Sequence, residues 1–189
     1  MQRIKGFSIL EVMIAVTIFS AVGAGIYKLQ LVNISATQQI TTKQLMMQSA
    51  INLSNQIYSN LNYCATTVTA RVPGCSAAGG LSAYAEGAYS DHVVVSNMTD
   101  CSTTNCNDAN LANYILYNWK KSFESMNLPS GNINGIVCRD TSLAIPTSGN
   151  SGCNGNGGLV IKMVWQSHIE TAESALGANN YIILPVPSR

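Results

Sequence analysis

The sequence has little charge and little proline, and each shortage excludes something. Only 10% of its 189 residues are charged and the formal net charge is +1, whereas charged residues make up about a quarter of an average soluble domain. Basic residues form no wide patch, so binding to nucleic acid through a broad positive surface is not expected. The first proline is Pro73, so a long N-terminal stretch lacks the residue that most strongly breaks helices.

Cysteine is absent from the first part of the chain and frequent afterwards. An even number of cysteines in a chain delivered across a membrane indicates disulfides and an oxidising compartment such as the periplasm. The alternative, a metal site, fits poorly because the closest cysteines are not spaced as zinc ligands usually are. Six cysteines allow 15 connectivities, and we expect pairs that are close in sequence. These pairs are Cys64–Cys75, Cys101–Cys106 and Cys138–Cys153, of which the last encloses turn-forming Gly and Asn residues.

The apolar residues are concentrated at the N-terminus. After six residues that include Arg3 and Lys5, the 20 residues from Phe7 to Ile26 contain a single charge, Glu11. A helix of that length spans about 30 Å, the thickness of the hydrocarbon core of a bilayer. The basic residues before it predict a cytoplasmic N-terminus and a periplasmic C-terminal part.

Two ordinary interpretations of this segment leave something unexplained. A secretory signal peptide has a shorter apolar stretch, followed by a small-x-small cleavage site. A plain membrane anchor has no reason to carry Glu11, because a carboxylate in a spanning helix is costly and usually functional.

The residues from Gly6 to Ala15, GFSILEVMIA, resemble the signature of type IV pilins and pseudopilins, a class III signal. The resemblance implies cleavage between Gly6 and Phe7 by a prepilin peptidase, followed by N-methylation of Phe7. It also implies an assembly role for Glu11, whose carboxylate would pair with the new α-amine of a neighbouring subunit or with that of its own chain.

The helix is expected to continue past the membrane, to about residue 62. Met46, Ala50, Leu53, Ile57 and Leu61 recur at helical spacing and form one apolar face. The predicted fold class is α+β and pilin-like: a long N-terminal helix, transmembrane in its first half, packs on a C-terminal antiparallel sheet with disulfides. The predicted organisation is a leader peptide over 1–6, a membrane or filament-core segment over 7–34, and a periplasmic globular domain over 35–189.

Further elements are expected in the second half of the chain. A shorter helix over 110–126 would bury Leu111, Ile115 and Trp119 and could be capped by Asp108. Strands are expected over 91–96, 135–139, 159–166 and 181–186, with the third of these buried on both faces. The Gly- and Asn-rich stretch 149–158 would join two antiparallel strands.

Two stretches of this half carry a narrower resemblance, to the type IV pilus modification protein PilV. They are YNW at 117–119 with LPSG at 128–131 and VCRD at 137–140, and LVIKMVW at 159–165. The resemblance implies a minor pilin that helps to prime pilus assembly, with a place at the tip as one expectation, together with other minor pilins and the major pilin. The fibre would support adhesion, twitching motility or DNA uptake. The alternatives are a minor pseudopilin of type II secretion and a ligand-binding tip adhesin.

The sequence offers no sign of an enzyme. No residues form a recognisable catalytic triad, dinucleotide fingerprint or P-loop. We therefore expect no catalytic residue, no cofactor and no metal ion, and we expect His92 and His168 to be ordinary surface histidines. The expected location is the inner membrane and then the pilus at the cell surface.

Overall fold

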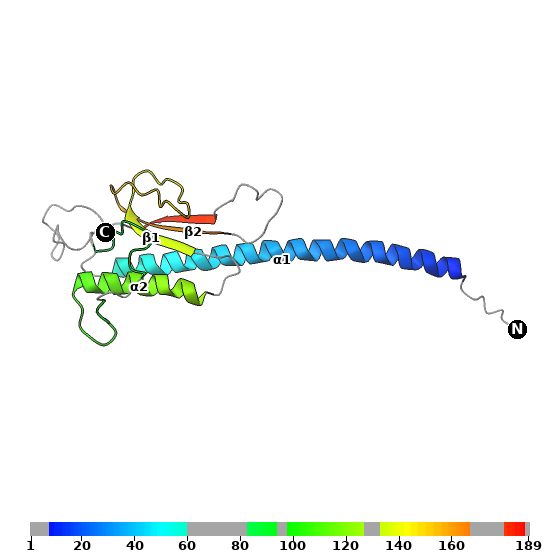
Figure 1. The fold of residues 1–189 in the computed structure, drawn as a ribbon, viewed down its shortest axis with the longest axis horizontal. Coiled ribbons are helices and arrows are strands. Elements are labelled where there is room, and N and C mark those ends of the chain that lie inside the picture. The colour runs from blue at the N-terminus through cyan, green and yellow to red at the C-terminus, as the bar shows by residue number, and fades with distance from the viewer. Residues whose placement is uncertain (1–7, 60–82, 94–97, 127–132, 167–179, 188–189) are drawn as a thin grey trace. The chain divides into compact units, whose positions relative to one another are not determined.

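The computed structural model describes residues 8–59, 83–93, 98–126, 133–166 and 180–187. The chain divides into two compact units, Met1–Thr41 and Thr42–Arg189. The elements are the helices α1 (Ile9–Ser59) and α2 (Asp108–Ser125) and the strands β1 (Ile133–Arg139), β2 (Leu159–Trp165) and β3 (Asn180–Pro185) (Figure 1).

Helix α1 runs without interruption for 51 residues, about 77 Å at 1.5 Å per residue. This length was predicted from two features of the sequence: it has no proline in this region, and its apolar residues recur at steps of three and four. In the second unit the predicted stripe is confirmed, because Met46, Ala50, Leu53 and Ile57 are all buried. Leu61, the last residue of that stripe, lies outside the described residues.

The three strands form one antiparallel sheet in the order β1-β2-β3. Cys138 pairs with Val160 across the first ladder, and Met163 pairs with Ile182 across the second. All seven residues of β2 are buried, as predicted from its lack of alternation. The arrangement is the pilin-like α+β fold that the sequence predicted.

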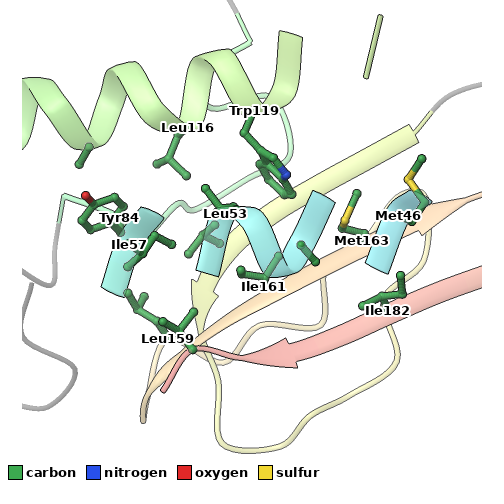
Figure 2. Close-up of a cluster of buried hydrophobic side chains, with 14 of the residues drawn as sticks. Met46, Leu53, Ile57, Tyr84, Leu116, Trp119, Leu159, Ile161, Met163 and Ile182 are labelled. Atoms are coloured by element: carbon green, nitrogen blue, oxygen red, sulfur yellow. The ribbon is translucent and has the colours of Figure 1, made fainter. Parts of the chain in front are cut away.

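The core of the second unit lies between the sheet and the helices (Figure 2). Its centre contains Met46, Leu53 and Ile57 from α1, Leu116 and Trp119 from α2, Ile161 and Met163 from β2, and Ile182 from β3. The Trp119 indole nitrogen donates to the Ser49 hydroxyl at 2.9 Å, so the one polar atom of this ring is satisfied where α2 meets α1.

Helix α2 differs from its prediction in two details. Its N-cap is Asn107 rather than Asp108, since the Asn107 side-chain oxygen accepts the Asn110 N–H at 2.8 Å. Its fully buried apolar residues are Ala112 and Leu116, with Trp119 nearly so, whereas Leu111 and Ile115 are only half-buried. The buried face is rotated because Lys120, which the apolar pattern ignored, is itself buried against an acidic partner.

The predicted strand over 91–96 is wrong for its described part, because residues 91–93 form a turn. Residues 94–96 lie outside the described residues. The turn belongs to a segment that covers the outer edge of β1. The Glu86 N–H donates to the Val137 carbonyl at 2.7 Å, and the Val137 N–H donates back to the Glu86 carboxylate at 3.0 Å.

Candidate assembly site

The first unit presents an apolar surface. An 18-residue window of α1 near the N-terminus has a mean hydropathy of 2.2, and none of it is buried. Large side chains such as Ile9 and Phe19 are more than 80% exposed. The helix is long and apolar enough to cross a membrane, and exposed apolar surface of this extent marks a site of membrane or protein contact.

The polar side chains inside this segment are satisfied by the helix itself. The Thr17 hydroxyl donates to the Ile14 carbonyl and the Ser20 hydroxyl donates to the Val16 carbonyl, both at 2.8 Å. A hydroxyl that bonds its own helix backbone does not need water. Neither residue therefore prevents α1 from lying in lipid or among other apolar helices.

Glu11 is the one charged residue of the apolar segment and lies in the first turn of α1. The N–H groups of Glu11 and Val12 donate at 3.0 and 3.2 Å to the carbonyl of Ser8, the residue directly before the first residue of α1. A carboxylate in the first turn is favoured by the helix dipole. Glu11 is exposed and can therefore meet a cation of another molecule. Gly6 and Phe7, the predicted cleavage and methylation residues, lie outside the described residues.

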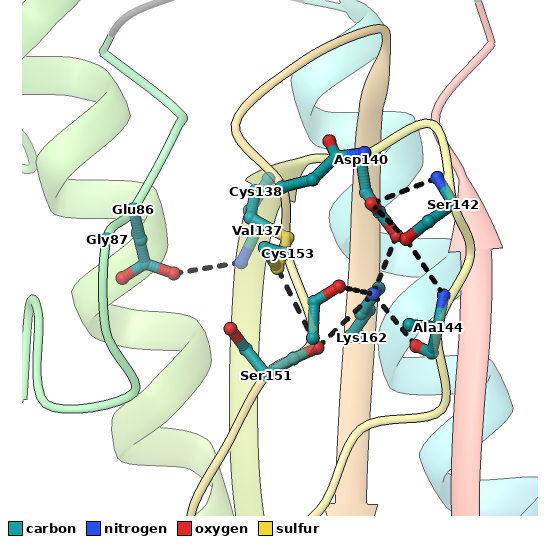
Figure 3. The surroundings of a disulfide bond; sticks show 12 residues. Glu86, Gly87, Val137, Cys138, Asp140, Ser142, Ala144, Ser151, Cys153 and Lys162 are labelled. Carbon is teal, nitrogen blue, oxygen red and sulfur yellow. Dashed lines mark hydrogen bonds and ion pairs between the residues drawn. A yellow bond between two sulfur atoms is a disulfide. The ribbon is translucent and has the colours of Figure 1, made fainter.

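The second unit contains a buried ion pair on the sheet face that points away from α1 (Figure 3). The Lys162 ammonium lies 2.7 Å from the Asp140 carboxylate, and both side chains are fully buried. Burial opposes ionisation of Asp140, but hydrogen bonds from Lys162 and Ser142 and the charge of Lys162 hold its pKa well below the ordinary value. The Asp140 carboxylate therefore stays ionised at neutral pH.

The same ammonium holds the connection between β1 and β2. It donates to the carbonyl oxygens of Ala144, Ser151 and Gly152 at 2.9, 3.2 and 3.0 Å. The loop 140–158 is thus fixed to the middle of β2 at three backbone positions.

Disulfides join Cys138 to Cys153 and Cys101 to Cys106, the two of the three expected pairs that fall within the described residues. The first closes the loop held by Lys162, and the second closes a short turn before α2. Cys64 and Cys75, the third expected pair, lie outside the described residues.

A second buried cluster corrects the prediction for His92. This histidine is not an ordinary surface residue: its side chain is only 26% exposed, and its Nδ1 lies 2.8 Å from the Glu86 carboxylate. The hydrogen bond to Glu86 raises the pKa of His92, and burial opposes that rise. Lys120 lies 2.6 Å from the same carboxylate and also donates to the carbonyls of Tyr89 and Asp91. His168 lies outside the described residues.

Sequence reasoning missed both buried clusters of charged residues, although a signal for one was present. Lys162 is the one charged residue in the apolar strand LVIKMVW, and a buried lysine requires an anionic partner. Asp140 and Lys162 stand in two separate stretches of the sequence, and the structure brings them together. In the ranges described, no three His, Cys, Asp or Glu side chains are grouped so that they could hold a metal ion.

One family model matches the chain, that of the prokaryotic N-terminal methylation motif, over residues 1–27. Neither a curated protein nor a solved structure matches. The N-terminus therefore carries the methylation motif of class III prepilin signals, which implies processing by a prepilin peptidase.

Proposed function

We propose that this chain is a minor pilin of a type IV pilus, similar to PilV, which helps to prime pilus assembly. The observation that carries the proposal is the coincidence of three features in one segment. The methylation motif covers residues 1–27, an exposed apolar helix begins within it, and its lone charge is Glu11 in the first turn.

The chemistry of maturation explains why these features occur together. Cleavage after Gly6 converts an uncharged peptide bond into a free α-amine on Phe7. N-methylation keeps the positive charge of that amine. In an apolar environment an unpaired charge is expensive, so the amine of one subunit and the Glu11 carboxylate of a neighbour attract each other strongly. This pairing sets the axial position of adjacent helices.

The two parts of the chain suit two environments. In the proposal, residues 7–34 lie in the inner membrane and later in the filament core. Residues 35–189 form a periplasmic domain, which the disulfides support because they require an oxidising compartment. Arg3 and Lys5 precede the helix and favour a cytoplasmic N-terminus.

The minor-pilin role rests on the two PilV-like stretches, which provide the two halves of the Lys162–Asp140 pair. In this role the protein joins other minor pilins and the major pilin through helices that lie side by side in the membrane. Co-anchoring raises their effective concentration, so individual contacts between periplasmic domains can be weak. The resulting fibre supports adhesion, twitching motility or DNA uptake.

Processing is the first test. We expect Gly6→Val to leave an uncleaved precursor in the inner membrane, and intact-mass analysis of the wild type to show a mature chain that starts at methylated Phe7. Gly23→Val is the matched control, since a side chain there meets no neighbouring atom and cleavage should be normal. A mature chain that starts near residue 25 would show an ordinary signal peptide instead.

Incorporation is the second test. Glu11→Gln keeps the shape of the side chain and removes its charge, so cleavage should continue while the subunit disappears from sheared fibres. Glu11→Asp, which keeps the charge, should retain part of the incorporation. Wild-type levels of the Gln variant in fibres would refute the pairing role. If the protein co-purifies only with pseudopilins of a secretion system, its role is that of a minor pseudopilin in type II secretion and not that of a pilus subunit.

A further inference from the structure

Three asparagines of this chain are followed directly by glycine, in the pairs Asn134–Gly135, Asn154–Gly155 and Asn156–Gly157. Such a pair can modify itself in water, because the backbone nitrogen of the glycine can reach the carbonyl carbon of the asparagine side chain. Glycine has no Cβ to obstruct this approach, and it lets the backbone adopt unusual conformations. All three pairs lie within the described residues, and their surroundings differ.

The reaction has two steps and needs only water. The glycine nitrogen loses its proton to water or hydroxide and bonds to the side-chain carbonyl carbon, while the bond from that carbon to the amide nitrogen breaks and ammonia leaves. The product is a five-membered cyclic imide. Water then opens the imide at one of its two carbonyls, which leaves aspartate or isoaspartate in place of asparagine. Hydrogen bonds that hold the side chain or the glycine N–H therefore slow ring closure.

The sheet holds Asn134 in place. This residue pairs with Val164 in the ladder between β1 and β2, and the following Gly135 is buried and pairs with Met163. The Asn134 side-chain nitrogen also donates to the Ser148 carbonyl at 3.1 Å. Ring closure would require the backbone to leave the ladder, so the fold protects this asparagine.

Hydrogen bonds hold the Asn154 side chain on both of its polar atoms. Its Oδ1 accepts the N–H groups of Thr141 and Asn156 at 3.3 and 2.9 Å, and its Nδ2 donates to the Thr141 hydroxyl at 2.7 Å. The nitrogen that would attack it is occupied as well, because the Gly155 N–H donates to the Arg139 carbonyl at 3.0 Å. Ring closure at Asn154 would disturb all of these bonds.

Asn156 is held less firmly than the other two. Its side chain is exposed, and among the described residues it makes one hydrogen bond, from Nδ2 to the Asn154 carbonyl at 3.2 Å. The Gly157 N–H donates to no described residue. Glycine is required at position 157, since its φ is 84° and a Cβ there would overlap the Thr141 side chain. The fold therefore keeps the reactive pair and leaves both of its reacting groups accessible.

We propose that Asn156 is a site of spontaneous deamidation, converted by water to aspartate and isoaspartate through a cyclic imide with Gly157, whereas the fold preserves Asn134 and Asn154. The product adds a negative charge to a loop in which no residue from Thr141 to Gly158 is charged. The protein then exists in an amide form and a carboxylate form, and the share of the second grows with the age of the molecule. This inference does not rest on the proposed pilin function.

The test uses the full-length, disulfide-bonded chain purified in detergent. It is incubated at mildly alkaline pH in water enriched in the heavy oxygen isotope, so that only imides opened during the incubation carry the label. Reduction and proteolysis follow in ordinary water at acid pH, and mass spectrometry with fragmentation locates the label. We expect Asn156 to be labelled at least about tenfold faster than Asn134 or Asn154, which corresponds to about 1.4 kcal/mol in activation free energy.

The unfolded chain provides the reference. After reduction and in denaturant, each of the three asparagines still has its glycine neighbour but has lost the hydrogen bonds of the fold. Their labelling rates should therefore differ far less than in the folded chain. This comparison separates selection by the fold from selection by the local sequence.

Variants test the chemistry and the hydrogen bonds separately. Asn156→Gln would need a six-membered ring and should abolish labelling at that position. Thr141→Val keeps the branched shape but removes the hydroxyl that accepts from Asn154, so labelling of Asn154 should rise at least about twofold, as expected for the loss of one hydrogen bond. Thr147→Val is the matched control, because its hydroxyl bonds to Asn150 in the same loop and labelling of Asn154 should not change.

The outcomes are distinct. Equal labelling of Asn154 and Asn156 in the folded chain overturns the assignment, as does an unlabelled Asn156 when the denatured chain is labelled. An unchanged Asn154 in Thr141→Val overturns the hydrogen bonds as the cause of protection. Intact-mass analysis of the same samples reports cleavage after Gly6, so a failure of the pilin proposal is seen separately.

Discussion

Breaking the Lys162–Asp140 pair from one side should cost far more than exchanging any exposed charge. Lys162→Met keeps most of the side-chain volume but removes the ammonium. The Asp140 carboxylate, which is fully buried, then loses its cation, and the carbonyls of Ala144, Ser151 and Gly152 lose their common donor. One-sided loss of a buried ion pair costs about 3–5 kcal/mol, a large fraction of the 5–15 kcal/mol that stabilises a typical domain.

A double variant isolates the unpaired charge as the cause. Asp140→Asn keeps an acceptor for the Ser142 N–H and hydroxyl but has no charge to leave unpaired. Combined with Lys162→Met, it should restore at least about 2 kcal/mol of the loss, so that the two substitutions are strongly non-additive. Urea unfolding of the full chain in detergent, followed by the fluorescence of Trp119 and Trp165 in the core, measures both effects.

Acid should weaken the same pair. Because the pKa of Asp140 is lowered from 3.8 in the folded state, its contribution is fully present above pH 3.8 and is lost as the pH falls below that value. Lys162→Met should show a smaller loss in this range. Lys121→Met, at an exposed lysine, is the control and should change stability by less than about 0.5 kcal/mol. A Lys162→Met cost below about 1 kcal/mol, or strict additivity in the cycle, would refute this account.

Three other substitutions follow from the packing, the disulfides and the buried histidine. Gly135→Ala should lower the unfolding free energy by about 1–3 kcal/mol, because a Cβ there would lie 2.6 Å from the indole ring of α2. Cys138→Ser should cost about 3 kcal/mol and Cys101→Ser about 2 kcal/mol, since the loop of the first is longer. The hydrogen bond to Glu86 raises the pKa of His92. The contribution of the protonated His92 to the unfolding free energy is therefore fully present below pH 6.5 and is lost as the pH rises through the raised pKa. His92→Gln should remove that part of the pH dependence.

Controls and contrary results are available for each. Gly149→Ala meets no neighbouring atom and should be neutral in the same unfolding assay; equal costs at the two glycines would contradict the packing argument. A larger loss from Cys101→Ser than from Cys138→Ser would contradict the loop-length argument. A wild-type stability that is flat between pH 6 and 9 would show that His92 does not titrate with folding.

Periodic patterns predicted the long helix and the central strand because such patterns report local geometry directly. The steps of three and four along α1 fixed its buried face, and the absence of alternation in β2 indicated burial on both sides. For the described residues 91–93 the strand prediction failed because β-propensity is weak against context. These residues turn instead, with Glu86 bonded to Val137 of β1 and His92 bonded to Asn113 of α2.

The buried charges could not be assigned from sequence, since each depends on a partner brought close only by the fold. Lys162 forms an ion pair with Asp140, at the start of the loop 140–158, and Lys120 forms an ion pair with Glu86, which lies in a different segment. A lone lysine among aliphatic residues indicates that a carboxylate must be near, but not which one. The buried face of α2 was predicted wrongly for the same reason. A search for apolar residues at helical spacing leaves out Lys120, which is in fact buried.

The covered edge of β1 has a consequence for aggregation of this protein. Val137 has both backbone hydrogen-bonding groups occupied by Glu86, and the Arg139 carbonyl accepts the Gly155 N–H at 3.0 Å. A foreign strand could join the sheet here only by displacing the fully buried Glu86 carboxylate from Lys120 and His92. Amyloid-like growth from this side is therefore opposed in the folded monomer itself. Crowded copies of the protein are therefore less able to add to one another strand by strand at this edge of the sheet.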